Sequence, residues 1–212
     1  MKRVAAIALG SNLASRFGDR DANLREAIRR ARELGDLRAV SRFYDTAPVG
    51  MTEQPRFLNA AMLLETELEP VELMRALLAI ERAMGRERSA VAAKGPRVID
   101  LDLLLMDDVV IPAGRVQAEA EGGGAEAGGV QANIVRAEAA GGSAETPGIG
   151  AEAGGGGAEA VGLQAEAVEL TLPHPAMAHR RFVLEPLAEI APKMVDPLSG
   201  RTIEEMLTGL AI

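Results

Sequence analysis

Two aspartates separated by one residue lie in the apolar segment 98–105. In an extended strand, alternate side chains point to the same face, so Asp100 and Asp102 would share one face and their apolar neighbours the other. Two carboxylates placed in this way repel each other unless a cation lies between them or in front of them. Mg²⁺ suits this position because it prefers oxygen ligands and completes its shell with water and substrate phosphates. A solvent-facing polar strand edge is the alternative interpretation.

A basic loop leads directly into this strand. It contains the segments Gly85-Arg86-Glu87-Arg88 and Lys94-Gly95-Pro96-Arg97. Such a loop can move, and guanidinium groups are suited to phosphate oxygens. Polyphosphate transfer requires this combination, because metal ions bridge the phosphates while arginines neutralise the charge that develops on them. A solvated run of charge would explain the arginines alone, but not their position beside paired aspartates.

Composition excludes several other kinds of site. The chain has 212 residues and no cysteine, so a metal must bind oxygen atoms or the two histidines. The segment Gly10-Ser11-Asn12 lacks the lysine and second glycine of a Walker loop, so a nucleotide site of that type is not expected. The formal net charge of -8 argues against nucleic acid as the main partner. No apolar run is long enough for a membrane span, and we expect a cytoplasmic protein.

The apolar pattern predicts the elements that position these residues. In chain order, the pattern indicates strands over 2–9, 37–44, 57–68 and 97–106, with helices over 21–34 and 70–84. The order β-α-β-β-α-β is typical of the ferredoxin-like fold, an α+β sandwich in which an antiparallel sheet carries both helices on one face. Further along the chain we expect an extended segment over 170–174, a short helix over 184–190 and a C-terminal helix from Thr202.

Residues 113–168 differ in composition from the rest of the chain. They contain 16 Ala, 15 Gly and 8 Glu, and no aromatic residue. Glycine clusters oppose a continuous helix, and so little bulky apolar surface cannot offset the entropy of ordering. We therefore expect a mobile insertion within a single domain, 1–212. A short-period solenoid is the alternative, but the large apolar residues that would stack between its turns are missing.

Six short motifs follow one another along the chain. They are Leu9-Gly10-Ser11-Asn12-Leu13, Thr46-Ala47-Pro48-Val49-Gly50, Gln54-Pro55-Arg56-Phe57-Leu58-Asn59, Gly85-Arg86-Glu87-Arg88, Gly95-Pro96-Arg97-Val98-Ile99-Asp100-Leu101-Asp102 and Leu172-Pro173-His174-Pro175. Their order and spacing resemble those of the 6-hydroxymethyl-7,8-dihydropterin pyrophosphokinase family, over residues 3–112 and 169–208. Members of that family work in folate biosynthesis and transfer the terminal pyrophosphoryl group of ATP to the pterin hydroxymethyl group, leaving AMP.

The resemblance implies a role for each matching side chain. Asp100 and Asp102 would bind two Mg²⁺ ions that bridge the ATP phosphates, and Arg86 and Arg97 would contact the phosphates as catalytic residues. The pterin would be bound by Thr46, Pro48, Val49, Phe57, Asn59 and Phe182, with the two phenylalanines on either side of the ring. ATP would be bound by Glu81, Arg88, Leu103, Thr171, His174 and Arg180. From the residues alone, the pattern favours a core position for the two phenylalanines, and Glu81 could be a surface charge.

The resemblance also implies the partners and the mode of reaction. ATP and hydroxymethyldihydropterin would be the substrates, and the protein would be a monomer that binds neither nucleic acid nor membrane. Loops 45–56 and 85–97 would close over both substrates to exclude water. The chain departs from the family near Ala92, at Pro175 and at Glu169, and these changes bear on ATP affinity. A non-catalytic ligand-binding module, or an interaction scaffold built on the Gly/Ala/Glu-rich segment, are the alternatives.

Overall fold

The structure is a computed structural model that describes residues 1–86, 95–116 and 168–210. Arg88 and most of segment 113–168 lie outside these ranges, so the predictions made for them are not tested. The elements are β1 (Arg3–Ser11), α1 (Arg20–Ala31), β2 (Asp36–Val40), β3 (Tyr44–Thr46), β4 (Phe57–Thr66), α2 (Pro70–Ala83), β5 (Asp100–Met106), β6 (Arg115–Val116), β7 (Val168–Glu169), a 3₁₀ turn (Met177–His179), α3 (Arg181–Ile190) and α4 (Ile203–Thr208).

One antiparallel sheet forms the centre of the molecule. Its strand order is β2-β4-β1-β5, and β3 also pairs with β4. The first strand of the chain, β1, lies between β4 and β5, and it pairs with both in antiparallel register. The short strands β6 and β7 form a separate two-stranded ribbon. The predicted α+β class with an antiparallel sheet is therefore confirmed.

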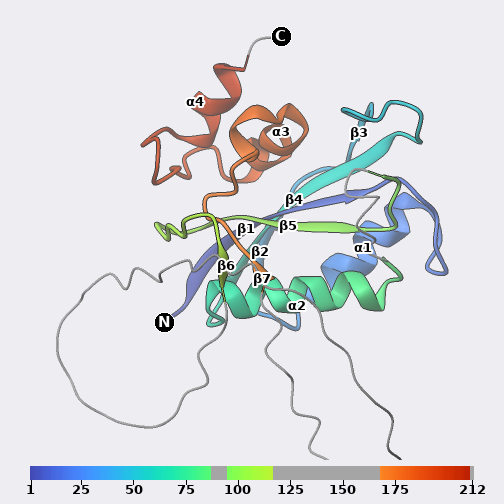
Figure 1. Cartoon of the computed structure of the whole chain (residues 1–212), viewed down its shortest axis with the longest axis horizontal. Coiled ribbons are helices and arrows are strands. Elements are labelled where there is room, and N and C mark those ends of the chain that lie inside the picture. The colour runs from blue at the N-terminus through green and yellow to red at the C-terminus, as the bar shows by residue number, and fades with distance from the viewer. Residues whose placement is uncertain (87–94, 117–167, 211–212) are drawn as a thin grey trace, which may run out of the picture.

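Helices cover both faces of the sheet, with α1 and α2 on one side and α3 and α4 on the other (Figure 1). Alternate residues of β1, such as Ile7 and Leu9, pack in one core with the apolar stripes of α1 and α2. Ala6, which precedes Ile7 and points to the opposite face, packs in a second core with α3 and α4. The two helices predicted over 21–34 and 70–84 thus share a face, as expected, and the C-terminal helices add a third layer.

The strand predicted over 37–44 is divided in the structure into β2 and β3. The Ser41 backbone N–H donates to Ala61 O at 2.9 Å, and the Ser41 Oγ accepts from the Ala61 backbone N–H at 2.9 Å. The hydroxyl therefore replaces a main-chain acceptor, and the regular ladder stops there. Pairing with β4 resumes from Tyr44 to Thr46, which places Thr46 opposite Phe57.

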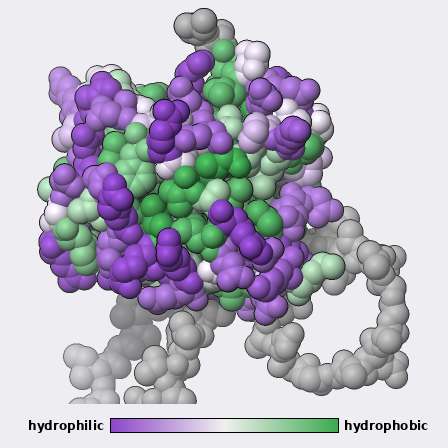
Figure 2. Space-filling model, turned by 180° about the vertical axis from the view of Figure 1, so that it is seen from behind, coloured by the Kyte–Doolittle hydropathy of each residue, from purple (hydrophilic) through white to green (hydrophobic). Residues whose placement is uncertain are grey.

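The molecular surface is unevenly divided between apolar and charged side chains. Figure 2 shows the reverse face, where apolar residues gather at the centre inside a frame of hydrophilic ones. Along β2, Lys2 Nζ lies 2.8 Å from Asp36 Oδ2, and Arg38 pairs with Glu65. Because β2 is an edge strand, these charged side chains discourage pairing with another sheet.

Within the described ranges no helix combines the length and the apolarity needed to cross a membrane.

Candidate active site

A cavity of about 550 Å³ opens at one end of the sheet, on the face covered by α3. Gly10 lies on its floor, paired with Asn59 of β4 on one side and with Asp100 of β5 on the other. Because neighbouring strands are about 4.8 Å apart, the backbones of Asn59 and Asp100 are about 10 Å apart. A Cβ at residue 10 would lie 3.0 Å from Asn59 Oδ1. Glycine therefore keeps the floor open between the two polar side chains.

The paired aspartates face this cavity. Asp100 and Asp102 both line it, whereas Leu101 and Leu103 are buried in the core on the opposite face of the sheet. The predicted alternation along the strand is confirmed. Burial, and after it the negative charge of Asp100, raises the pKa of the Asp102 carboxyl. The ionised form of Asp102 is thus disfavoured until a cation approaches.

Arg86 is held at the edge of the cavity by two carboxylates. Its Nη1 contacts Glu81 Oε1 and Asp100 Oδ1. Glu81 is only 1% exposed, and its Oε1 also accepts from the Leu101 backbone N–H at 2.7 Å. Burial alone would lower the pKa of Arg86, but the charges of Asp100 and Glu81 outweigh it, so the pKa is raised. Glu81 is therefore a buried anchor for Arg86 and not a surface charge.

Arg97 spans the distance between the aspartates and an aromatic ring. Its Nη2 lies 3.0 Å from Asp100 Oδ2, and its guanidinium carbon lies 5.2 Å from the centroid of the Phe57 ring. Both contacts are favourable for a guanidinium group. The two arginines predicted to act on phosphates are therefore brought together at Asp100.

The other end of the cavity carries aromatic and amide groups. Phe57 of β4 and Phe182 of α3 both line it, so a flat ring has an aromatic side chain available on each of two elements. Asn59 Nδ2 donates to Thr46 Oγ1 at 2.7 Å, which fixes the orientation of the amide. Val49 lies at the rim with 71% of its surface exposed. This end has the groups needed to bind a planar, hydrogen-bonding ligand.

His174 and Arg180 complete the lining on the side of the third layer. The His174 backbone N–H donates to Leu104 O at 2.8 Å, which fixes this residue directly to β5. Its Nδ1 accepts from the Ala176 backbone N–H at 3.2 Å. The other ring nitrogen, Nε2, is then the one available to a ligand.

Four other predicted binding residues do not line the cavity in the described part of the chain. They are Pro48, Glu81, Leu103 and Thr171. Leu103 is 2% exposed and packs in the core with α1 and α2, on the face away from the cavity. The binding roles of all four, like that of Arg88 outside the described ranges, stay predictions.

Two polar side chains that line the cavity, those of Gln54 and His179, received no role from the sequence. Gln54 belongs to one of the motifs, so its spacing from Asn59 was an available signal. His179 follows the last motif without a recognisable pattern, and only the tertiary structure places it at the cavity.

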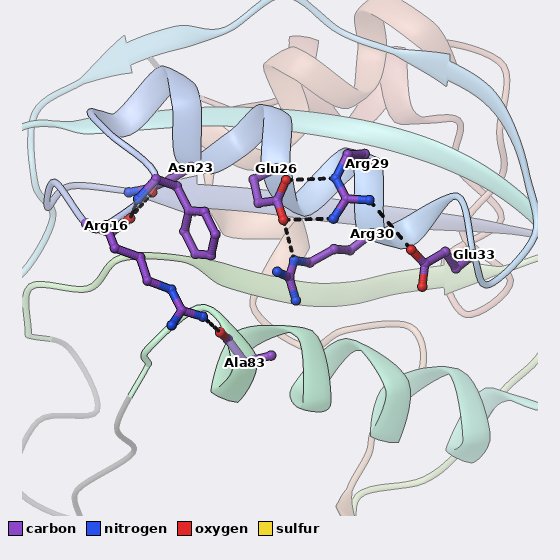
Figure 3. Close-up of polar contacts among 9 residues, drawn as sticks. Arg16, Asn23, Glu26, Arg29, Arg30, Glu33 and Ala83 are labelled. Atoms are coloured by element: carbon purple, nitrogen blue, oxygen red, sulfur yellow. Dashed lines mark hydrogen bonds and ion pairs between the residues drawn. The ribbon is translucent and has the colours of Figure 1, made fainter.

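The start of the basic loop is fixed by a residue from the segment before α1. Arg16 Nη2 donates to Ala83 O, the last residue of α2, at 2.8 Å (Figure 3). The final carbonyl groups of a helix have no partner within it, and a cation there is favourable. Arg86, three residues further on, therefore begins from an anchored helix end.

The donor set fits a metal ion that is shared with phosphates. Within residues 1–86, 95–116 and 168–210, no three His, Asp or Glu side chains are grouped so as to hold a metal ion. The available ligands are the two carboxylates of Asp100 and Asp102. Mg²⁺ commonly binds to one or two carboxylates and takes its remaining ligands from water and substrate phosphates. The residues present therefore fit Mg²⁺ that is bound together with a nucleotide.

Comparison with known proteins agrees with this chemistry. Residues 6–121 match the family model of 7,8-dihydro-6-hydroxymethylpterin-pyrophosphokinase (HPPK). A 2-amino-4-hydroxy-6-hydroxymethyldihydropteridine pyrophosphokinase of Methylorubrum extorquens is 32% identical, over 97% of this chain and 92% of that protein. A folate synthesis bifunctional protein of Arabidopsis thaliana is 42% identical over 52% of this chain, and the match spans only 23% of that relative.

A solved structure has the same fold. An HPPK-DHPS of Plasmodium falciparum superposes with a TM-score of 0.62 at 14% identity, and the match covers 98% of this chain and 44% of that one. This chain thus spans less than half the length of the bifunctional proteins it matches. With the family model covering more than half of the chain, and one relative matched over nearly its whole length, the chain belongs to the HPPK family.

Proposed function

We propose that this chain transfers the terminal pyrophosphoryl group of ATP to the hydroxymethyl oxygen of 6-hydroxymethyl-7,8-dihydropterin and releases AMP. Family membership supports the reaction. The observation that carries it is that Gly10 separates Asn59, at the aromatic end, from Asp100, at the charged end, within one cavity. Such a cavity can hold a flat ring and a polyphosphate next to each other.

At the aromatic end, the side chains bind and orient the pterin. Phe57 and Phe182 contact the two faces of the ring, and the amide of Asn59 forms hydrogen bonds with its polar edge. Because Thr46 already fixes that amide, little rotational freedom is lost when the pterin binds. The pterin hydroxymethyl group then points along the floor, past Gly10, towards Asp100.

At the charged end, Asp100 and Asp102 would hold two Mg²⁺ ions. When bound there, the metal ions would neutralise and orient the phosphates. Arg86 and Arg97 contact Asp100, so phosphate oxygens bound beside that carboxylate lie within reach of both guanidinium groups. His174 and Arg180 would bind the remainder of the nucleotide.

The proposed reaction is a direct in-line transfer. The pterin hydroxyl oxygen forms a bond to the β-phosphorus while the bond from that phosphorus to the bridging oxygen of the α-phosphate breaks. The electron pair of the broken bond stays on AMP, and the hydroxyl proton passes to solvent. Since a carbinol is a poor nucleophile, positioning and electrostatic stabilisation must supply most of the rate enhancement.

We further infer that the fold is ferredoxin-like. The strand order β5-β1-β4-β2, with α1 and α2 on one face, supports that arrangement. One domain over 1–212 with an insertion at 113–168, a monomeric state and a cytoplasmic location stay predictions from the sequence.

Release of AMP from ATP and hydroxymethyldihydropterin, with and without Mg²⁺, tests the proposal. Asp100→Asn should lower the rate by about 100-fold or more, because it removes a charge from the site where phosphate charge is balanced. Asp108→Asn is the matched control, since Asp108 is exposed just beyond the end of the same strand and outside the cavity lining. Binding of both substrates without AMP release would instead favour a non-catalytic ligand-binding module.

A further inference from the structure

Asn12 is a buried polar side chain that lies immediately behind the cavity. It is 2% exposed. Its Nδ2 donates to Gln54 Oε1 and to Pro55 O, both at 3.1 Å, and its Oδ1 accepts from the Arg97 backbone N–H at 2.7 Å. The Asn12 backbone N–H also donates to Arg97 O at 3.0 Å. One side chain therefore contacts two segments that are far apart in the sequence.

These two segments serve opposite ends of the cavity. Gln54 and Pro55 belong to residues 47–56, which we call the pterin loop, and Gln54 itself lines the cavity. Gln54 Nε2 donates to Met51 O at 2.7 Å, which carries the contact further into this loop. On the other side, Arg97 extends its guanidinium group to Asp100. Asn12 is thus a direct link between the pterin loop and the arginine at the phosphate end.

The chemistry of the contact requires an amide. A carboxylate offers no N–H to Gln54 or Pro55, and an apolar side chain would leave the Arg97 N–H without its acceptor. Removing one partner of a buried hydrogen bond exposes the full desolvation penalty of the other. Asn12 therefore supplies both the donor that Gln54 and Pro55 accept from and the acceptor that the Arg97 N–H requires.

We infer that Asn12 is a positioning residue that couples pterin binding to nucleotide binding by holding the pterin loop and the Arg97 backbone in one hydrogen-bonded unit. This inference rests on the proposed function. Nucleotide phosphates that hold the Arg97 side chain restrict its backbone, and Asn12 transmits that restraint to Gln54 and Pro55. Binding of either substrate then orders the segment that binds the other, so each substrate increases the affinity for the other, which is positive coupling.

The experiment measures this coupling without turnover. Isothermal titration gives the dissociation constant of 6-hydroxymethyl-7,8-dihydropterin with and without saturating α,β-methylene-ATP and Mg²⁺, an analogue whose scissile position cannot be cleaved. The ratio of the two constants is the coupling factor, and titration in the reverse order must give the same factor. The wild-type protein should show a factor of about five or more.

Two variants should lower the factor towards one. Asn12→Asp keeps an acceptor for the Arg97 N–H but loses both donors to the pterin loop. Gln54→Ala removes one of the two acceptors and lies in a surface loop, so it decides the matter even if Asn12→Asp does not fold. An unchanged factor in either folded variant, or a wild-type factor of one, would overturn the inference.

Asn23→Asp is the matched control for a purely structural effect. Asn23 is likewise buried, and its Nδ2 donates to Leu13 O at 2.8 Å, but its side-chain hydrogen bonds stay within residues 11–23. This variant should lose stability yet keep the wild-type coupling factor. Loss of coupling in it as well would overturn the specific role of Asn12. Absence of AMP release with intact coupling would instead contradict the proposed function alone.

Discussion

Asp100 and Asp102 share one face of β5 but differ in their surroundings. Arg86 and Arg97 contact Asp100 and offset its charge. Burial and the charge of Asp100 raise the pKa of Asp102. The unliganded protein therefore carries one balanced carboxylate and one whose ionised form is unfavourable, and Mg²⁺ bound with a nucleotide would relieve the second.

Asp102→Asn should stabilise the unliganded protein near neutral pH while lowering AMP release by about 100-fold. Because the pKa is raised in the folded state, the stability that the protonated carboxyl contributes is lost as the pH rises through that pKa. The amide of the variant does not ionise, so its gain in stability over the wild type should vanish below pH 3.8, the ordinary pKa of this carboxyl group. Thermal unfolding at pH values from below 3.8 to neutral measures the difference in stability from the wild type, with Asp108→Asn as control. No gain near neutral pH would contradict the stated cause of the shift.

Gly10→Ala should raise the KM for the pterin about tenfold while the protein stays folded. The added Cβ would lie 3.0 Å from Asn59 Oδ1, so the amide must move away from the position that Thr46 fixes. Loss of one well-made hydrogen bond to the ligand corresponds to about this factor. Steady-state kinetics provide the test. Gly114→Ala, whose Cβ would meet no atom closer than 3.9 Å, is the control and should match the wild type.

Single residues were predictable where the signal was local. The spacing of Asp100 and Asp102 was enough to place both side chains on one face. The contact of Arg97 with Phe57, and that of Asn12 with Gln54, join positions some forty residues apart. No local periodicity encodes such contacts, because they arise only when β1, β4 and the segment before β5 are assembled.

At the scale of elements, α1 carries a network of charges on its exposed side (Figure 3). Glu26 accepts from Arg29 Nε at 2.8 Å and from Arg30 Nε at 2.7 Å. The hydrogen bond from Arg29, together with that from Arg30, lowers the pKa of Glu26 from 4.5 to about 2. These contacts span three and four residues, which is the spacing at which side chains meet on a helix.

Glu26→Gln should destabilise the protein near neutral pH and lose this effect in acid. A lowered pKa means that the stability from the ionised carboxylate is present above 4.5 and disappears as the pH falls through about 2. Denaturant unfolding at several pH values measures the difference from the wild type. Glu33→Gln is the control, because Glu33 is 73% exposed with one contact at 3.7 Å, and its effect should be smaller. A difference that does not change with pH would contradict the ionic origin.

The elements themselves were largely predictable. Helical spacing of apolar residues identified α1 and α2, and the order β-α-β-β-α-β predicted that both would cover one face of the sheet. The break between β2 and β3 was not predictable, because it depends on the Ser41 hydroxyl meeting the backbone of Ala61. A serine in a strand gives no sign of which main-chain group it will replace.

At the scale of the whole molecule, the third layer was the least predictable part. The pattern indicated short helices near the C-terminus but not their partner. In the structure, Ala6 and Ala61 face α3 and α4 from the two middle strands. Small side chains there let α3 approach closely, which brings Phe182 to the cavity. Packing of this kind depends on which surfaces remain free once the sheet has formed.

Replacing segment 117–167 by a short turn should preserve AMP release and increase stability. Arg115 pairs with Glu169 and Val116 with Val168, so the two ends of the segment are already adjacent. Shortening the connection lowers the entropy cost of closing it, by about 2 kcal/mol for a change of this size. A series of glycine-serine linkers of increasing length should show stability falling slowly with the logarithm of length. Loss of folding or of activity in the shortest variants would show that the segment is structural.

The position of Gly10 between two functional strands has a consequence for substrate choice. Asn59 and Asp100 belong to neighbours of the same central strand, so the span between them is set by sheet geometry and cannot adapt to the ligand. Under the proposed function, the cavity would then select substrates by the length of the alcohol arm as well as by the shape of the ring. A hydroxyethyl homologue would carry its oxygen about 1.5 Å too far, and a misplacement of that size can cost about 100-fold in rate. Comparing kcat/KM for the two alcohols would show whether the span between Asn59 and Asp100 is fixed.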